Sequence, residues 1–106
     1  MIKVIKNEKI GVIRVKVWGK NNFAFFDEDI AKAVGYKNTS VALRDVSFED
    51  KILSQIKASS GKQNMYLLNT KGASIVIKKA LKSKKISEEK AELFLNWLDE
   101  EIKGVI

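Results

Sequence analysis

A short stretch, residues 37–44, combines several side chains that proteins use to bind nucleic acid. It holds the bases Lys37 and Arg44, the amide of Asn38 and the hydroxyl of Ser40. Bases and hydroxyls donate hydrogen bonds to phosphate oxygens, and Asn and Arg can also pair with base edges. The stretch predicts a short helix whose free N–H groups near residues 38–40 would meet a phosphate. Plain capping by Asn38 and a surface ion pair for Arg44 explain the same residues about equally well.

A second candidate contact region lies at residues 57–63. Lys57, Ser59, Lys62 and Gln63 are small, polar or basic, as expected of a hairpin tip that touches phosphates or enters a groove. The alternative is an ordinary solvated turn. The binding interpretation is favoured because residues 51–85 contain no acid. Trp18 and Tyr36 can be imagined stacking on unpaired bases, although such aromatic residues more often pack in or beside the core.

The residue types that most often perform catalysis are missing from this chain. It has no histidine and no cysteine, so the commonest general base, the commonest metal ligand and any thiolate chemistry are excluded. Asp27, Glu28 and Asp29 could be taken for metal ligands, but acids at a helix start are better explained by the helix dipole. No glycine-rich phosphate loop or nucleophile motif is present. We therefore expect no metal, no cofactor and no enzymatic activity.

The charge of the chain is large and unevenly distributed. Twenty lysine and arginine residues oppose 13 acids, which gives a formal net charge of +7. This excess favours anionic partners, nucleic acid first and an acidic protein or membrane surface second, although lysine also serves simply as a solubilising residue. The sign reverses in residues 86–106, where acids outnumber bases. The last segment is therefore a poor candidate for contact with phosphates.

Hydrophobic periodicity predicts an α+β fold. Apolar and polar residues alternate at 3–6 and 11–18, and a turn at 19–22 leads into a strand at 23–26, so that the last two strands form a hairpin. A second hairpin is predicted from residues 51–57 and 63–68. Helical patterns follow each hairpin in pairs, which gives the order ββααββαα in a single domain over residues 1–106. This domain can also be one module of a longer protein.

Short polar residues mark the expected helix ends. Gly35 stands where a left-handed C-cap ends the first helix, and the first turn of that helix carries an acid run. The last helix is expected to stop at Gly104. The residues expected to cap the successive helices are Asp27, then Asn38, Thr39 or Ser40, then Asn69 or Thr70, and finally Ser87.

Four blocks of the chain form a specific pattern. The first is FFDEDIAKAVGYKN at residues 25–38, a strand leading into an acidic helix start and a Gly-Tyr turn. The second runs from Ala42 to Val46 and continues at residues 49–51. The third is LNTKG at residues 68–72. The closing helix supplies Ala91, Phe94, Trp97, Glu100 and Glu101. In this order and at these spacings, the four blocks resemble the BRO N-terminal domain of phage antirepressors and large DNA-virus proteins.

The resemblance implies DNA binding and a role in transcription regulation by a phage or prophage. Asp45 departs from the family pattern, which has a second base after Arg44, and the C-terminal module that often accompanies the domain is absent from this chain. The expected partner is double- or single-stranded DNA, with a repressor protein, or a second copy in a homodimer, as further candidates. The rival is a protein-interaction module that neutralises a repressor through the acidic last helix or a hairpin edge without touching DNA.

The chain has neither an apolar run of about 18 residues nor a signal-peptide core at its N-terminus. No contact with a membrane and a cytoplasmic location are therefore expected.

Overall fold

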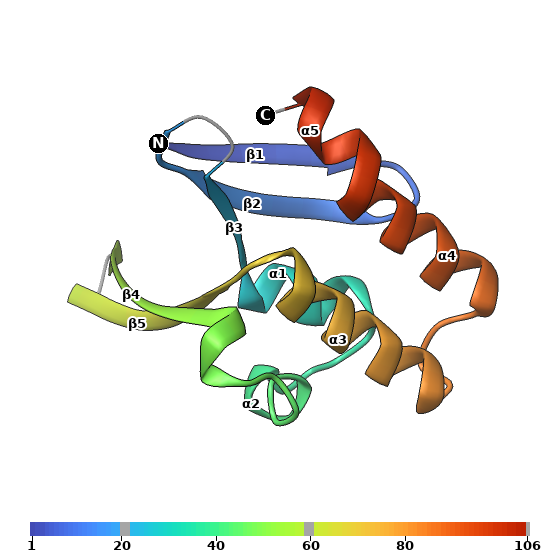
Figure 1. Ribbon diagram of the computed structural model, residues 1–106. Coiled ribbons are helices and arrows are strands. Elements are labelled where there is room, and N and C mark those ends of the chain that lie inside the picture. Colours follow the sequence, from blue (N-terminus) through green and yellow to red (C-terminus); the bar gives the residue numbers. More distant parts are fainter. Residues whose placement is uncertain (20–21, 59–60, 106) are drawn as a thin grey trace.

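The computed structural model describes residues 1–19, 22–58 and 61–105, which form one five-stranded antiparallel sheet with helices packed against it (Figure 1). The strand order is β1-β2-β3-β5-β4. The strands are β1 (Ile2–Asn7), β2 (Gly11–Val17), β3 (Phe23–Phe26), β4 (Lys51–Ala58) and β5 (Gly61–Leu68). The helices are α1 (Asp27–Ala33), α2 (Thr39–Ala42), the 3-10 turn η1 (Phe48–Asp50), α3 (Thr70–Lys82), α4 (Glu88–Asn96), the π-helical turn η2 (Trp97–Glu101) and α5 (Ile102–Val105).

The α+β class is confirmed, whereas the order ββααββαα is only approximate. Three strands, not two, precede α1, because the alternating residues of β1 pair along their whole length with β2. The two predicted hairpins also belong to one sheet, since Phe25 and Phe26 of β3 pair with Leu68 and Leu67 of β5. The final helix continues past Gly104 to Val105 and contains a π-helical turn. Residues 20 and 21 of the predicted 19–22 turn lie outside the described residues.

One face of the sheet and the inner sides of the helices share a single hydrophobic core. Ile13, Val15, Phe25 and Leu68 supply the strand side and are fully buried. Phe94 and other residues of α1, α3 and α4 complete the core from the opposite side. Trp97 is also buried, with only 2% of its surface exposed, and its ring contacts those of Phe25 and Phe94. Trp97 therefore packs in the core and presents little surface to a partner.

Several helix ends agree with the sequence. Gly35 has a φ of +87°, and the N–H of the next residue, Tyr36, returns to the carbonyl of Ala31, which closes α1. The side chains of Asn38, Asn69 and Ser87 accept hydrogen bonds from backbone N–H groups at the starts of α2, α3 and α4.

The predicted cap Asp27 is wrong. It is the first residue of α1, and its carboxylate bonds to the N–H of Glu28 and across the sheet to the N–H of Tyr66.

The start of α3 is fastened tightly to the end of η1. Asn69 accepts a hydrogen bond from the N–H of Gly72 at 2.7 Å and donates its amide to the Asp50 carboxylate at 3.1 Å. The backbone N–H of Asn69 donates to the Asp50 carbonyl at 3.2 Å. A Cβ atom on Gly72 would lie 2.5 Å from that carbonyl oxygen, so only glycine fits without displacing the backbone. This junction fixes where β4 begins relative to α3.

We expect Gly72→Ala to lower the free energy of unfolding by about 1–3 kcal/mol, because the new methyl group overpacks against main chain that cannot swing aside. Gly104→Ala is the matched control: its Cβ would meet nothing within 4 Å, and in a helix alanine is favoured over glycine by roughly 0.5–1 kcal/mol. Chemical denaturation of both variants tests the pair. Equal stability of Gly72→Ala and the native chain would refute the close approach.

Candidate nucleic-acid interface

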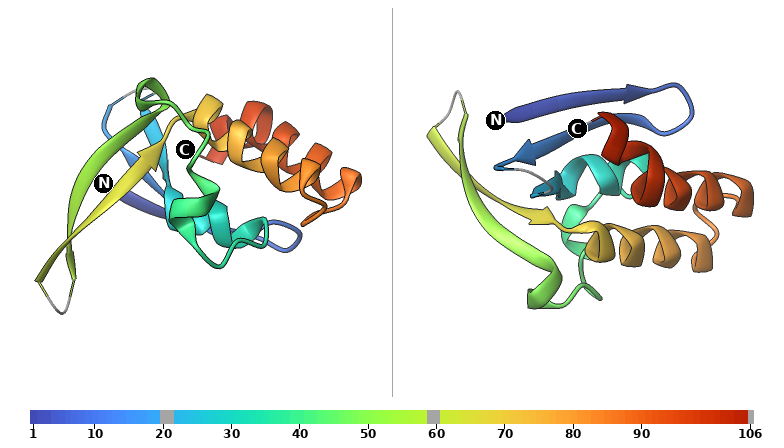
Figure 2. Two further views of the ribbon diagram at one scale, coloured as in Figure 1. Left: turned by 90° about the horizontal axis from the view of Figure 1, so that it is seen from below. Right: turned by 45° about the horizontal axis from the view of Figure 1, so that its top comes forward.

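A groove lies between α2 and the hairpin formed by β4 and β5. Its volume is about 710 Å³, and its walls come from segments far apart in the sequence. Ser40 and Arg44 line it from α2 and the turn that follows, and Lys51, Asn64 and Tyr66 line it from the hairpin. Figure 2 shows that the hairpin projects away from the helices. The groove thus brings Ser40 and Arg44 of the first predicted region beside the base of the hairpin, whereas none of the lining residues that the structure describes falls within 57–63.

The wall formed by α2 is short but well anchored. Asn38 accepts hydrogen bonds from the N–H groups of Ser40 at 2.9 Å and Val41 at 3.4 Å, so the capping interpretation of Asn38 is what the structure shows. These two N–H groups are already bonded and are not free to meet a phosphate. Lys79 of α3 donates to the Val41 carbonyl at 2.6 Å and pairs with Asp45 at 3.4 Å. The four-residue helix is therefore held against α3.

The four predicted contact residues of this region are all on the surface: Lys37, Asn38, Ser40 and Arg44 are exposed. Within the described part of the chain, no acid lies at ion-pair distance from Arg44, so the alternative of a surface ion pair does not hold there. The acid that departs from the family pattern, Asp45, is instead bound by Lys79. The guanidinium of Arg44 remains available for an external anion.

Three of the predicted contact residues of the hairpin lie on the outer parts of its two strands. Lys57 of β4 pairs in register with Lys62 of β5, and Gln63 of β5 pairs with Ile56 of β4. The side chains of Lys57, Lys62 and Gln63 fall outside the described part of the structure, as does the whole of Ser59. The register alone brings two lysines together near the end of the arm.

Lys51 is a groove residue that the sequence did not single out. Its ammonium group lies 4.9 Å from the ring centroid of Phe48 and 4.8 Å from that of Tyr66. Two aromatic faces therefore hold the cation at the base of the hairpin without neutralising its charge. Phe48 is 83% exposed, which leaves this arrangement open to solvent. The contact joins η1 to β5, and local sequence patterns carry no signal for it.

The groove also contains two carboxylates. Asp27 is buried, and this loss of hydration raises its pKa above the ordinary value, although hydrogen bonds from the N–H groups of Glu28 and Tyr66 act in the opposite direction. The side chain of Glu28 is about half exposed, and its carboxylate lies 3.8 Å from the Arg14 guanidinium. The negative charge of Glu28 therefore faces the same groove as Arg44 and Lys51.

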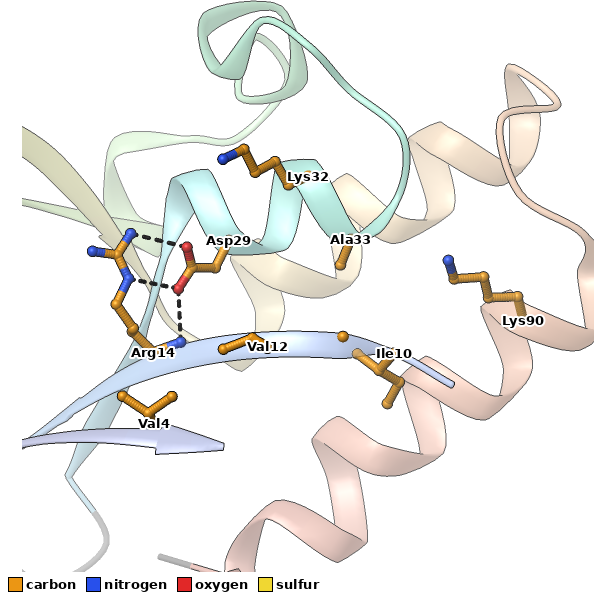
Figure 3. A pocket seen from close by; sticks show the side chains of 9 residues that line it. Val4, Ile10, Val12, Arg14, Asp29, Lys32, Ala33 and Lys90 are labelled. Carbon is orange, nitrogen blue, oxygen red and sulfur yellow. Dashed lines mark hydrogen bonds and ion pairs between the residues drawn. The ribbon is translucent and has the colours of Figure 1, made fainter. Parts of the chain in front are cut away.

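The third acid of the α1 start, Asp29, also binds Arg14 but lines a different hollow. Asp29 accepts three hydrogen bonds from Arg14, from its backbone N–H at 2.7 Å, Nε at 2.8 Å and Nη2 at 2.9 Å (Figure 3). The hydrogen bond to Asp29 is the main reason why the pKa of Arg14 lies above its ordinary value. The pair lines a second hollow beside Lys32 and Val12. Because its charges already satisfy each other, we assign it a structural role.

The described residues contain no cluster of three or more acids, histidines or cysteines that would hold a metal ion. None of the helices within these residues has the length and apolar character needed to cross a membrane.

The structure is a small α+β domain with a groove between α2 and the hairpin. The family model described as the BRO family, N-terminal domain, matches residues 13–103 of the 106, and the chain therefore belongs to that family. The resemblance found in the sequence is confirmed. No curated protein and no solved structure shows significant similarity to the chain.

The buried carboxyl of Asp27 leads to a prediction about pH. Because its pKa is raised on folding, the stability it contributes is fully present below the unfolded-state pKa and is lost as the pH rises through the folded-state pKa. We therefore expect the difference in unfolding free energy, native minus Asp27→Asn, to grow as the pH is lowered from neutrality. Urea denaturation across a pH series measures it. A difference that stays constant or shrinks toward acid pH would show that burial does not perturb this group.

Proposed function

We propose that this chain is the DNA-binding module of an antirepressor-type transcription regulator from a phage or prophage. Membership of the BRO N-terminal family supports this function. The observation that carries it is the groove in which Arg44 meets Lys51 and Asn64 of the hairpin. In this proposal the module acts by binding and performs no chemistry on the nucleic acid.

The groove residues suit both kinds of contact that DNA-binding proteins make. Arg44 and Lys51 supply positive charge, and the hydroxyl of Ser40 supplies a further donor to phosphate oxygens. Arg44 and Asn64 have the donor and acceptor patterns that read guanine and adenine edges, respectively. The projecting hairpin extends the contact, with Lys57 and Lys62 adjacent in register on its two strands. We include Ser59, Gln63 and Lys37 in the same interface.

The distribution of charge agrees with this orientation. Residues 51–85 contain no acid, and they form the hairpin and α3. The exposed acids Glu88, Glu89 and Glu92 lie on α4, which packs against α3 on the side of the molecule away from the hairpin (Figure 1). DNA approaching the groove would meet the basic end first, because the field of the acidic helix is screened within about 10 Å at 0.1 M salt.

The experiment that tests this function is a fluorescence-anisotropy titration with labelled duplex and single-stranded DNA at about 50 and 200 mM salt, since phosphate contacts weaken steeply over that range. We expect micromolar or tighter binding at the lower salt, and a loss of about tenfold or more in Arg44→Glu. The matched control is Lys6→Glu on β1, at the opposite edge of the sheet, for which we expect the DNA affinity to fall by about twofold. Absence of binding at the lower salt, or equal losses in the two variants, would overturn the proposal.

The carboxylate of Glu28 should weaken the interface that it faces. Glu28→Gln removes the repulsion between this carboxylate and bound phosphate. The ion pair that Glu28 forms with Arg14 is long and partly exposed, so the fold should tolerate its loss. We expect the DNA affinity to rise by about threefold, which corresponds to a screened interaction of under 1 kcal/mol. Glu92→Gln on α4 is the control and should leave the affinity unchanged. A drop in affinity for Glu28→Gln would place the DNA elsewhere.

A further inference from the structure

The sheet has a second face, which α1 borders beside Val12 and Arg14. Ala24, Phe26 and Leu67 form a small separate hydrophobic cluster there, with Met65 beside it, and all four belong to strands. The guanidinium of Arg14 lies 4.5 Å from the centre of the Phe26 ring and covers it. Among the described residues, side chains of the strands, and not a second layer of helices or strands, therefore cover this cluster.

Apolar side chains run across this face from one edge strand to the other. Val4 lies opposite Arg14, Phe26 lies opposite Leu67, and Leu67 lies opposite Ile52, so these residues form one row over five strands. Val4 is 56% exposed and Ile52 is 50% exposed. Val12 and Trp18, on the same side of β2, are 54% and 45% exposed. These exposed residues flank a buried centre, where Phe26 and Leu67 are 1% and 2% exposed. Exposed apolar side chains gathered on one face in this way mark an interaction site more often than chance.

Part of this surface is hollowed. A groove of about 430 Å³ is lined by Lys16, Trp18, Ile52, Leu53, Ser54 and Leu67. It runs between the end of β2 and the outer strand β4, across the buried cluster. The groove gives an incoming side chain a place to enter, which a flat sheet face does not.

The charges on this face that are left unpaired have one sign. The sequences of the five strands contain no aspartate or glutamate. Lys6 and Lys16 lie on this side, opposite Val12 and Ile2, and within the described residues neither has an acidic partner. Arg14 differs, because Asp29 neutralises it. An occupant of complementary charge is therefore acidic.

The apolar component distinguishes between two acidic occupants, a nucleic acid and a protein. Bases bind to sheets by stacking on aromatic rings, and this face exposes one indole, that of Trp18, among aliphatic side chains such as Val4, Val12 and Ile52. Aliphatic surface gains free energy when it is covered by the apolar side chains of another polypeptide. The mixture therefore fits protein better than nucleic acid.

We propose that the open face of the sheet, comprising Val4, Val12, Lys16, Trp18, Ile52 and Leu67, is a docking surface for an acidic polypeptide segment that carries apolar side chains. Its carboxylates pair with Lys6 and Lys16, and its apolar side chains cover the row and enter the groove. None of these six residues lines the groove beside α2, although Leu53 lines both that groove and the hollow of this face.

Selection from a library of random short peptides displayed on phage, with the whole chain immobilised, tests this inference. We expect the enriched peptides to carry more acids than bases together with apolar residues. The strongest of them, synthesised with a fluorescent label, should bind Lys16→Glu about tenfold more weakly. The exposed change Val4→Asp provides a second variant on the same face. The charge-matched control Lys78→Glu, on the exposed side of α3, should change the affinity by no more than about twofold.

Three results would overturn the inference. They are the absence of enriched peptides, enriched peptides without net negative charge, and equal binding by the native chain and both face variants. A fourth would reassign the face to nucleic acid: weaker binding of a single-stranded oligonucleotide by Lys16→Glu and Trp18→Ala, with no peptide bound. Circular dichroism and thermal unfolding establish that each variant is folded before its affinity is compared.

Discussion

The arrangement of this domain depends on two carboxylates in the first turn of α1. Asp27 reaches the N–H of Tyr66 on β5, and Asp29 takes three hydrogen bonds from Arg14 on β2. The chain leaves the sheet at the end of β3, and these bonds tie the first turn of the helix to strands on both sides of that exit. Hydrogen bonds to ionised groups are stronger than those between neutral partners, and the side chains of Arg14 and Asp29 form a bidentate ion pair. The angle of α1, and with it the position of α2, follows from this joint.

These hydrogen bonds also determine which charged side chains are paired within the fold. The acids of α1 either form hydrogen bonds and ion pairs within the fold or line the groove, whereas the strands contain no acid. Cations such as Arg44, Lys51 and Lys16 are left without acidic partners among the described residues. They lie on two surfaces, the groove beside α2 and the open face of the sheet. One surface is polar and suits phosphate, and the other is largely apolar and suits protein. A regulator that binds both DNA and a protein needs two surfaces of this kind.

Local chemistry explains which parts of this structure could be predicted from the sequence. The caps Asn38, Asn69 and Ser87 and the turn at Gly35 act within a few residues of themselves, so the sequence shows them directly. The pairing of β3 with β5 and the groove depend on segments distant in the chain, and no local pattern reports them. The acid run illustrates the limit: a helix dipole explains it adequately, yet two of its members bind distant strands. Local reasoning therefore placed Asp27 at a cap, where it does not act.

The central claim is that the groove between α2 and the hairpin receives DNA. The most direct test is to record the amide resonances of the isotope-labelled chain while duplex DNA is added. The account predicts that the amides of Arg44, Lys51 and Asn64 shift together, and that those of α4 stay in place. Shifts confined to α4, or to the open face around Val12 and Trp18, would contradict it.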